Sequence, residues 1–149
     1  MRVVIPADIM EKIRRHGEET YPQECCGFML GSAEDGVRKV SEIRGQSNER
    51  TDSPQNRFLI SPEQFKAAER AARASGQTMV GIYHSHPDSP ARPSEYDRDH
   101  AWPWFSYLIV NVGNGKAGEG KAWQLRDDRS GYDLLQLEIL DGMHKGEKS

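Results

Sequence analysis

The strongest constraint on the fold is an apolar, β-branched run at residues 107–112. Runs of this kind form strands whose two faces are both covered. A second apolar run, bounded by turn residues, covers residues 25–31 and predicts another buried strand. Residues 78–83 predict a central strand that leads directly into His84-Ser85-His86-Pro87. The chain is therefore expected to fold around a sheet.

Helices are predicted between these strands. The first covers residues 6–21, because Ile5, Ile9 and Ile13 fall on one stripe and a proline stands in the first turn. The second follows a serine that suits the N-cap position and ends before a glycine. This second helix is predicted at about residues 62–75, after Ser61. A third, short helix is predicted to begin at Ser94.

Hairpins connect the remaining predicted strands. A turn at residues 34–36 leads into a strand at 37–43, and a glycine-rich turn at 113–120 leads to a strand at 122–125. Other segments predict short strands at 58–60 and 134–140, and a polar loop at 45–56. Because hairpins dominate among the interleaved strands and helices, the predicted class is α+β or α/β with a largely antiparallel or mixed sheet.

The composition suits one domain and argues against several classes of function. The 149 residues include 20 Lys+Arg and 23 Asp+Glu, so a basic face for nucleic acid is not expected. No apolar run approaches the roughly 20 residues that a membrane span needs. The two cysteines are adjacent and cannot form a disulfide framework, which favours a cytoplasmic location. Residues 1–141 are expected to form the domain, with 142–149 as a disordered tail.

The His84-Ser85-His86-Pro87 segment predicts a metal site. Side chains alternate along a strand, so the two histidines point the same way and Ser85 points back. Pro87 stops the strand, and the following loop can fold back to bring Asp97 to the same place. Two nitrogens and one carboxylate oxygen leave one position open on a tetrahedral Zn²⁺, as in catalytic rather than structural sites.

Two further residues complete a predicted hydrolytic site. Glu24 stands immediately before a buried strand, and it could act as general base if that strand neighbours the histidine strand. Ser94 could donate a hydrogen bond to an oxyanion. The chemistry that fits these groups is hydrolysis of an amide. Glu24 considered alone is equally well explained as a solvated charge at the start of a strand.

The spacing of Ser94 and Asp97 has a structural explanation as well. Ser-x-x-Asp at the start of a helix resembles a capping box, and for this pair alone capping is the better interpretation. Ser94 can cap the helix and still turn its hydroxyl to the site. Asp97 is not expected to do both easily.

This set of residues resembles the JAB/MPN/JAMM zinc metalloprotease family. The signature of that family is an upstream glutamate, then His-Ser/Thr-His-Pro, and then a serine and an aspartate at fixed spacing. The chain matches the pattern at Glu24, His84-Ser85-His86-Pro87, Ser94 and Asp97. The similarity covers nearly the whole chain and is strongest with the small bacterial branch.

The resemblance implies a fold, a cofactor and a substrate class. It implies a JAMM/MPN (cytidine-deaminase-like) fold of class α+β, an α/β-type sandwich whose mixed, largely antiparallel sheet is flanked by helices. It implies Zn²⁺ bound by His84, His86 and Asp97. It also implies Glu24 as general acid/base and Ser94 at the oxyanion. The bacterial members act on the Gly-Gly C-terminal tail of ubiquitin-like sulfur-carrier proteins, so such a tail is the expected partner. Whether the protein is a monomer or a homodimer stays open.

Two other functions remain open. The fold also occurs as a non-catalytic scaffold for protein interactions, although such modules lack the metal ligands that this chain has. A thiol hydrolase could use Cys25 or Cys26, but buried cysteines more often pack as small apolar residues. His100 lies one helical turn after Asp97, so it could face the site or cover it without binding the metal.

Overall fold

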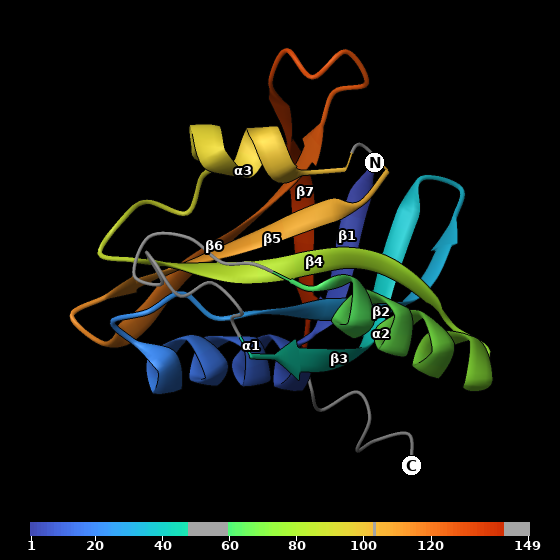
Figure 1. The fold of residues 1–149 in the computed structure, drawn as a ribbon, viewed down its shortest axis with the longest axis horizontal. Helices are drawn as coiled ribbons and strands as arrows, with labels where there is room; N and C mark the ends of the chain where they lie inside the picture. Colours follow the sequence, from blue (N-terminus) through green and yellow to red (C-terminus); the bar gives the residue numbers. More distant parts are fainter. Residues whose placement is uncertain (48–59, 103, 142–149) are drawn as a thin grey trace.

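The computed structural model describes residues 1–47, 60–102 and 104–141, without the side chains of Tyr96 and His100. Seven strands and three helices form in this described part of the chain (Figure 1). In chain order they are β1 (Arg2–Pro6), α1 (Ala7–Thr20), β2 (Cys26–Glu34), β3 (Val37–Gln46), α2 (Pro62–Ala74), β4 (Thr78–Pro87), α3 (Glu95–His100), β5 (Ser106–Gly113), β6 (Lys116–Leu125) and β7 (Tyr132–Leu140). None of these helices is long and apolar enough to cross a membrane.

The strands form one mixed sheet that closes into a barrel, in the order β1-β3-β2-β4-β5-β6-β7. Pairs β2–β3, β2–β4, β5–β6 and β6–β7 are antiparallel. Pairs β4–β5, β1–β3 and β1–β7 are parallel. The predicted mixed, largely antiparallel sheet with flanking helices is confirmed, and the closure is a feature that the sequence did not predict.

The strand that closes the barrel is the one that the sequence analysis missed. β1 pairs with both β3 and β7, so it joins the two ends of the sheet. Ile5 was assigned to the stripe of the first helix, but it lies in β1 opposite Ile139. The helix begins at Ala7, because Pro6 has an extended backbone (φ −63°, ψ 147°) and occupies the N-cap. The five residues of β1 are too few to show a strand period beside a strong helical one.

Two apolar clusters hold the helices on the sheet. The face of α1 that carries Ile9, Met10 and Ile13 packs with side chains of β1, β2, β4 and β5. On the other face of the sheet, Ala68 and Ala72 of α2 pack with residues of β2, β4 and β5. Figure 1 shows α1 and α3 on opposite sides of the central strands. Strand β4 therefore has one face toward α1 and the other toward α2 and α3.

Local signals account for most element boundaries. Ser61 accepts from the backbone N–H of Gln64, and the Gln64 side chain accepts from the Ser61 N–H, which makes a capping box at the start of α2. Gly76 follows the helix with φ +72°, as predicted for a glycine at this position. Asp35 and Gly36 both have positive φ, the pattern of a tight hairpin turn between β2 and β3.

The structure corrects the prediction for the glycine-rich segment. It was predicted as a turn over residues 113–120, but only Asn114 and Gly115 separate β5 from β6. Gly120 lies within β6, where an added Cβ would come 2.6 Å from the Met10 side chain. Gly120 therefore leaves room for the Met10 side chain of α1, and the chain does not turn at this residue.

Several predicted segments lie wholly or partly outside the described residues. They are the tail at 142–149, most of the loop at 45–56 and most of the strand at 58–60. Within the described part, β3 continues to Gln46, and Ile60 is not in a strand.

Candidate metal centre

Strand β4 supplies both histidines from the middle of the sheet. His84 lies opposite Cys26 of β2 and beside Ile109 of β5. The strand ends at Pro87, as predicted. His84 and His86 are both buried, with 1% and 7% of their surface exposed. The neighbouring strands therefore fix the backbone that carries the two rings.

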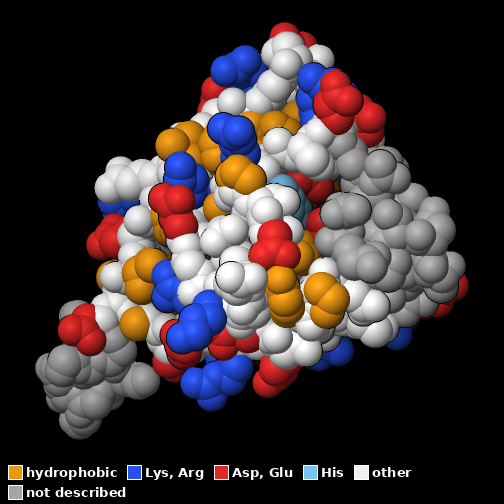
Figure 2. Space-filling model, turned by 90° about the vertical axis from the view of Figure 1, so that its left-hand side faces the viewer, with side chains coloured by type: hydrophobic (Ala, Val, Ile, Leu, Met, Phe, Trp, Pro, Cys, Tyr) orange, Lys and Arg blue, Asp and Glu red, His pale blue; other side chains and the backbone are white. Residues whose placement is uncertain are grey.

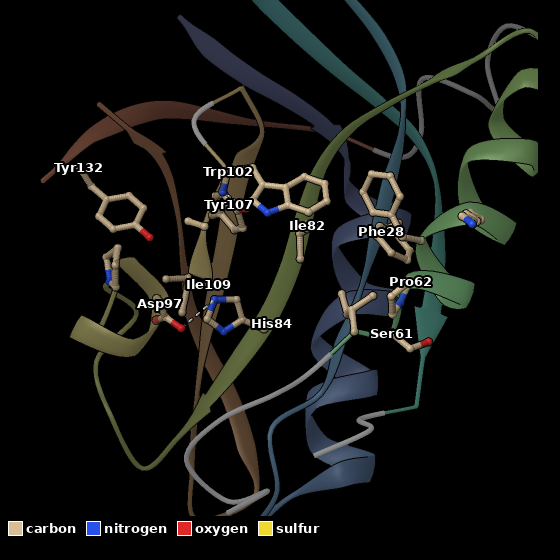
Figure 3. Close-up of a pocket in the computed structure, with 15 residues that line it drawn as sticks. Phe28, Ser61, Pro62, Ile82, His84, Asp97, Trp102, Tyr107, Ile109 and Tyr132 are labelled. Carbon is tan, nitrogen blue, oxygen red and sulfur yellow. Dashed lines mark hydrogen bonds and ion pairs between the residues drawn. The ribbon is translucent and has the colours of Figure 1, made fainter. Parts of the chain in front are cut away.

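Asp97 of α3 meets the two histidines. Its Oδ2 lies 3.1 Å from His86 Nε2, and its Oδ1 lies 3.8 Å from His84 Nε2. One ligand atom from each of the three residues lies within 4.8 Å of the others. Figure 3 shows Asp97 and His84 facing one another from the helix and the strand. Zn–N distances of 2.0–2.1 Å imply roughly 3.3 Å between tetrahedral ligands, so this spacing suits a single ion.

The hydrogen bond of His86 fixes the form of its ring. His86 Nδ1 lies 2.9 Å from the carbonyl oxygen of Pro90. A carbonyl can only accept, so Nδ1 donates its proton, and Nε2 is the nitrogen left to bind a metal ion beside Asp97. His86 Nε2 and Asp97 Oδ2 lie 3.1 Å apart, close enough for both atoms to bind one cation. This arrangement is the one expected of a site built to hold a cation.

The electrostatics of the cluster favour metal-binding forms of its residues. Burial lowers the pKa of His84 to about 4, although Asp97 opposes the shift. The ring is therefore neutral near pH 7, as a metal ligand must be. Burial alone would raise the pKa of Asp97, but the two imidazoles and the Ser94 N–H outweigh it and hold this pKa below its usual range. Asp97 is a carboxylate at neutral pH.

Asp97 also caps its own helix, which corrects one expectation. Its Oδ2 accepts from the Ser94 N–H at 2.9 Å, and its own N–H donates to Ser94 Oγ at 3.1 Å. The expectation that Asp97 could not both cap the helix and face the histidines is wrong. A carboxylate has about four acceptor positions, so a single oxygen can take the cap bond and still face His86.

Glu24 lies at the other side of the His84 ring. Strand β2 pairs with β4, which is the adjacency that the sequence left open. Glu24 is 3% exposed, and its Oε1 lies 3.8 Å from His84 Nδ1. The interpretation of Glu24 as a solvated surface charge is wrong, because its carboxylate is buried beside the cluster. Glu24 and Asp97 thus approach opposite nitrogens of one imidazole.

Ser94 is exposed at the start of α3. Its Oγ accepts from the Asp97 N–H, and accepting leaves the hydroxyl proton able to donate elsewhere.

The cysteines are placed poorly for nucleophilic catalysis. Cys25 and Cys26 are 2% and 0% exposed. Burial raises the pKa of the Cys25 thiol to about 11, whereas reactive cysteines are partly exposed and have a lowered pKa. The side chain of His100, which was considered as a further contact of the site, lies outside what the structure describes.

Two contributors were not predicted from the sequence. The Pro90 carbonyl orients His86, and Arg129 binds the end of α3 by donating to the carbonyls of Arg98 and Ala101 at 2.6 and 2.9 Å. A backbone carbonyl leaves no signature in the sequence. Arg129 stands in the loop between β6 and β7, far along the chain from α3, so no local pattern could have identified it.

A cavity of about 350 Å³ adjoins the cluster. His84 and Asp97 line one end of it (Figure 3). The remaining wall is largely apolar and includes Phe28, Phe65, Ile82, Trp102, Tyr107 and Tyr132. Figure 2 shows histidine and acidic side chains beside one another in a hollow on one face of the molecule. The cluster is therefore buried but reachable from a cavity large enough for part of a peptide.

Comparisons with known proteins identify the family of the chain. The model of the prokaryotic homologs of the JAB domain matches residues 6–126. The chain is 34% identical over 115 residues to the desampylase of Haloferax volcanii, which covers 74% of this chain and 81% of that protein. It is 32% identical over 126 residues to the CysO-cysteine peptidase of Mycobacterium tuberculosis, covering 84% of each. A solved structure from Desulfitobacterium hafniense matches with a TM-score of 0.82 and 29% identity over 93% of both chains.

The matched region contains the whole cluster. Residues 6–126 run from the last residue of β1 to the residue after β6 and include Glu24, both histidines, Ser94 and Asp97. The resemblance inferred from the motif is confirmed, and the chain belongs to the prokaryotic JAB-domain family.

Proposed function

We propose that this protein is a zinc-dependent peptidase that hydrolyses a peptide or isopeptide bond at the Gly-Gly C-terminus of a ubiquitin-like sulfur-carrier protein. One observation carries the proposal. His84, His86 and Asp97 present ligand atoms within 4.8 Å of one another, and the Glu24 carboxylate lies 3.8 Å from the same His84 ring. A metal-binding cluster with a separate buried carboxylate suits metal-assisted hydrolysis.

The enzyme class follows from the relatives. The chain is an isopeptidase-like hydrolase of the JAB family, whose curated relatives include a desampylase and a CysO-cysteine peptidase. Both names support a protein tail as substrate, and we extend that substrate class to this chain. Glycines at the end of such a tail have no side chains, so the tail can pass a narrow opening beside buried ligands. We place the reaction in the cytoplasm.

The donor set fits Zn²⁺, with two imidazole nitrogens, one carboxylate oxygen and a fourth position left for water. Bound there, Zn²⁺ would polarise a substrate carbonyl and lower the pKa of a water molecule towards about 7. Glu24 takes the proton of the attacking water and delivers it to the leaving amine. The Ser94 hydroxyl donates a hydrogen bond to the oxyanion. His86 keeps its orientation through the Pro90 carbonyl.

The direct test is incubation with a purified sulfur-carrier protein that bears extra residues after Gly-Gly, followed by intact-mass measurement. We expect the extension to be released by the zinc-loaded protein. The matched control is Glu24→Gln. This variant should keep stoichiometric zinc, but its turnover should be lower by a factor of about 10²–10⁴, as expected for loss of a general acid/base. Near-normal turnover in this variant would remove Glu24 from the mechanism.

The same assay separates the other two functions. Loss of activity with a chelator and recovery with added zinc would support the metallopeptidase. Loss with iodoacetamide would support a thiol hydrolase, which the burial of Cys25 and Cys26 opposes. An uncleaved carrier that binds the zinc-loaded protein tightly would support an interaction scaffold and contradict our proposal.

A further inference from the structure

We propose that Ser85, the residue between the two histidines, is a positioning residue that holds Glu24 beside His84. This inference rests on the proposed function, because it assigns how the general acid/base is kept in place. Ser85 lies on the face of β4 opposite the ligands, and it is fully buried. It is therefore not a candidate ligand, and its role must pass through another residue.

The contacts of Ser85 lead to the segment that carries Glu24. Ser85 Oγ accepts from the backbone N–H of Cys25 at 2.8 Å. The Ser85 N–H donates to the Cys25 carbonyl oxygen at 3.2 Å. Both backbone polar groups of Cys25 are thus bound to one residue. The Cys25 N–H belongs to the peptide unit that begins at Glu24, so the hydroxyl fixes the plane of that peptide.

Glu24 needs such a contact because the regular sheet stops short of it. Strand β2 begins at Cys26, and the pair Cys26–His84 is the last one between β2 and β4. Glu24 and Cys25 precede the strand. The two hydrogen bonds to Ser85 extend the pairing of β2 with β4 by one residue, as far as the peptide unit that follows Glu24. A strand end without them would fray in the way that terminal residues commonly do.

Helix α1 packs against the face of β4 that carries Ser85. A Cβ built on Gly17 would lie 3.4 Å from Ser85 Cβ and 3.0 Å from the Val112 side chain. Helix α1 therefore covers this face of β4 closely and limits where the hydroxyl can turn. The competing explanation is that Ser85 is simply a buried hydroxyl with a satisfied hydrogen bond, as most are. The two explanations differ in what happens to turnover when the hydroxyl is removed.

The first experiment compares Ser85→Ala with two matched variants of the zinc-loaded enzyme. We expect Ser85→Ala to lower kcat by about 10- to 100-fold, with KM and zinc stoichiometry unchanged. Ser85→Thr keeps the hydroxyl and should restore kcat to within about threefold of wild type. Ser106→Ala removes another buried hydroxyl, one that contacts Gln124 and not Glu24, and should leave kcat unchanged. An unchanged kcat in Ser85→Ala, or a fall in zinc affinity as large as the fall in kcat, would overturn the assignment.

A double-mutant cycle with Glu24→Gln tests whether the effect passes through Glu24. If it does, Ser85→Ala should change the residual turnover of Glu24→Gln by less than about twofold. The same 10- to 100-fold loss in both backgrounds would mean that Ser85 acts on the fold or the ligands, and the inference would fail.

A readout on the metal-free protein keeps this inference separate from the proposed function. The Cys25 amide should exchange its hydrogen faster in Ser85→Ala than in wild type or Ser106→Ala, as followed by NMR. Equal exchange in all three would contradict the positioning role whatever the activity. A wild-type protein without hydrolase activity would instead refute the proposed function.

Discussion

The two halves of the candidate metal centre are held in different ways. His84 and His86 lie on β4, which is paired along both edges with β2 and β5. Asp97 lies on α3, a helix of only six residues, which is too short to be stable without tertiary contacts. Its position depends on the capping box with Ser94 and on the bonds from Arg129. The sheet fixes two of the proposed ligands, whereas a few polar contacts fix the third.

This difference predicts how metal binding responds to substitution. A change at a histidine removes a ligand from a rigid frame and leaves nothing to replace it. A change around α3 lets Asp97 move, so zinc affinity should fall further as more of the hydrogen bonds that hold this helix are removed. The expected loss of zinc affinity therefore decreases from the histidines, through Asp97 and Arg129, to the helix cap at Ser94.

His86→Ala should have the largest effect. We expect it to abolish stoichiometric zinc binding, because a tetrahedral site with a single imidazole and a carboxylate cannot retain the ion. Elemental analysis after dialysis measures the loss. His16→Ala is the matched control on α1 and should keep one zinc per chain. Zinc retained by His86→Ala at wild-type affinity would remove this residue from the ligand set.

Asp97→Asn separates the ligand from the cap. The amide oxygen of asparagine can still accept from the Ser94 N–H, so the capping box and α3 should persist. The lost negative charge should weaken zinc binding by more than about 100-fold, beyond the usual effect of residues outside the ligand shell. A competitive chelator titration measures the affinity, and circular dichroism checks the fold. An affinity close to wild type would show that Asp97 serves only as a cap.

Arg129→Ala should have an intermediate effect. Removing both bonds to the end of α3 should lower zinc affinity by about 10- to 100-fold, because Asp97 then samples other positions. Arg126→Ala is the control from the same loop, since Arg126 pairs with the exposed Asp133 rather than with α3. Equal zinc affinities in these two variants would mean that the loop does not position Asp97.

Ser94→Ala should affect zinc affinity least. Loss of an N-cap costs about 1 kcal/mol, which corresponds to roughly a fivefold weaker affinity if α3 must be formed to bind zinc. Turnover should fall further, by about 10²–10³, if the hydroxyl donates to the oxyanion. Ser94→Thr keeps both functions and should recover both values. A Ser94→Ala enzyme whose turnover falls only as much as its zinc occupancy would exclude the oxyanion role.

The same contrast explains what could be predicted from the sequence. The histidine pair was predictable because the alternation of side chains along a strand is a local rule, and Ser85 turns to the other face as that rule requires. The sequence predicted that Glu24 stands just before a strand, but it did not predict that this residue lies beside His84. That position depends on the pairing of β2 with β4, which are far apart in the sequence. Arg129 reaches α3 across the fold, and no local pattern marks it.

The misread segments have equally specific causes. Residues 2–6 form the strand that closes the barrel, but they are few and run directly into a strong helical pattern. Gly120 suggested a turn, although its small size serves close packing against Met10. In both cases a tertiary contact determines the local structure, whereas the neighbouring residues in the sequence favour another local structure.

The most direct test of the account is X-ray absorption at the zinc edge of the loaded protein. Two histidine nitrogens and two oxygens, one from Asp97 and one from water, all at about 2.0–2.2 Å in a four-coordinate shell, are the predicted result. A sulfur neighbour at about 2.3 Å, which would have to come from Cys25 or Cys26, or a shell of oxygens alone, would contradict the assignment of His84, His86 and Asp97.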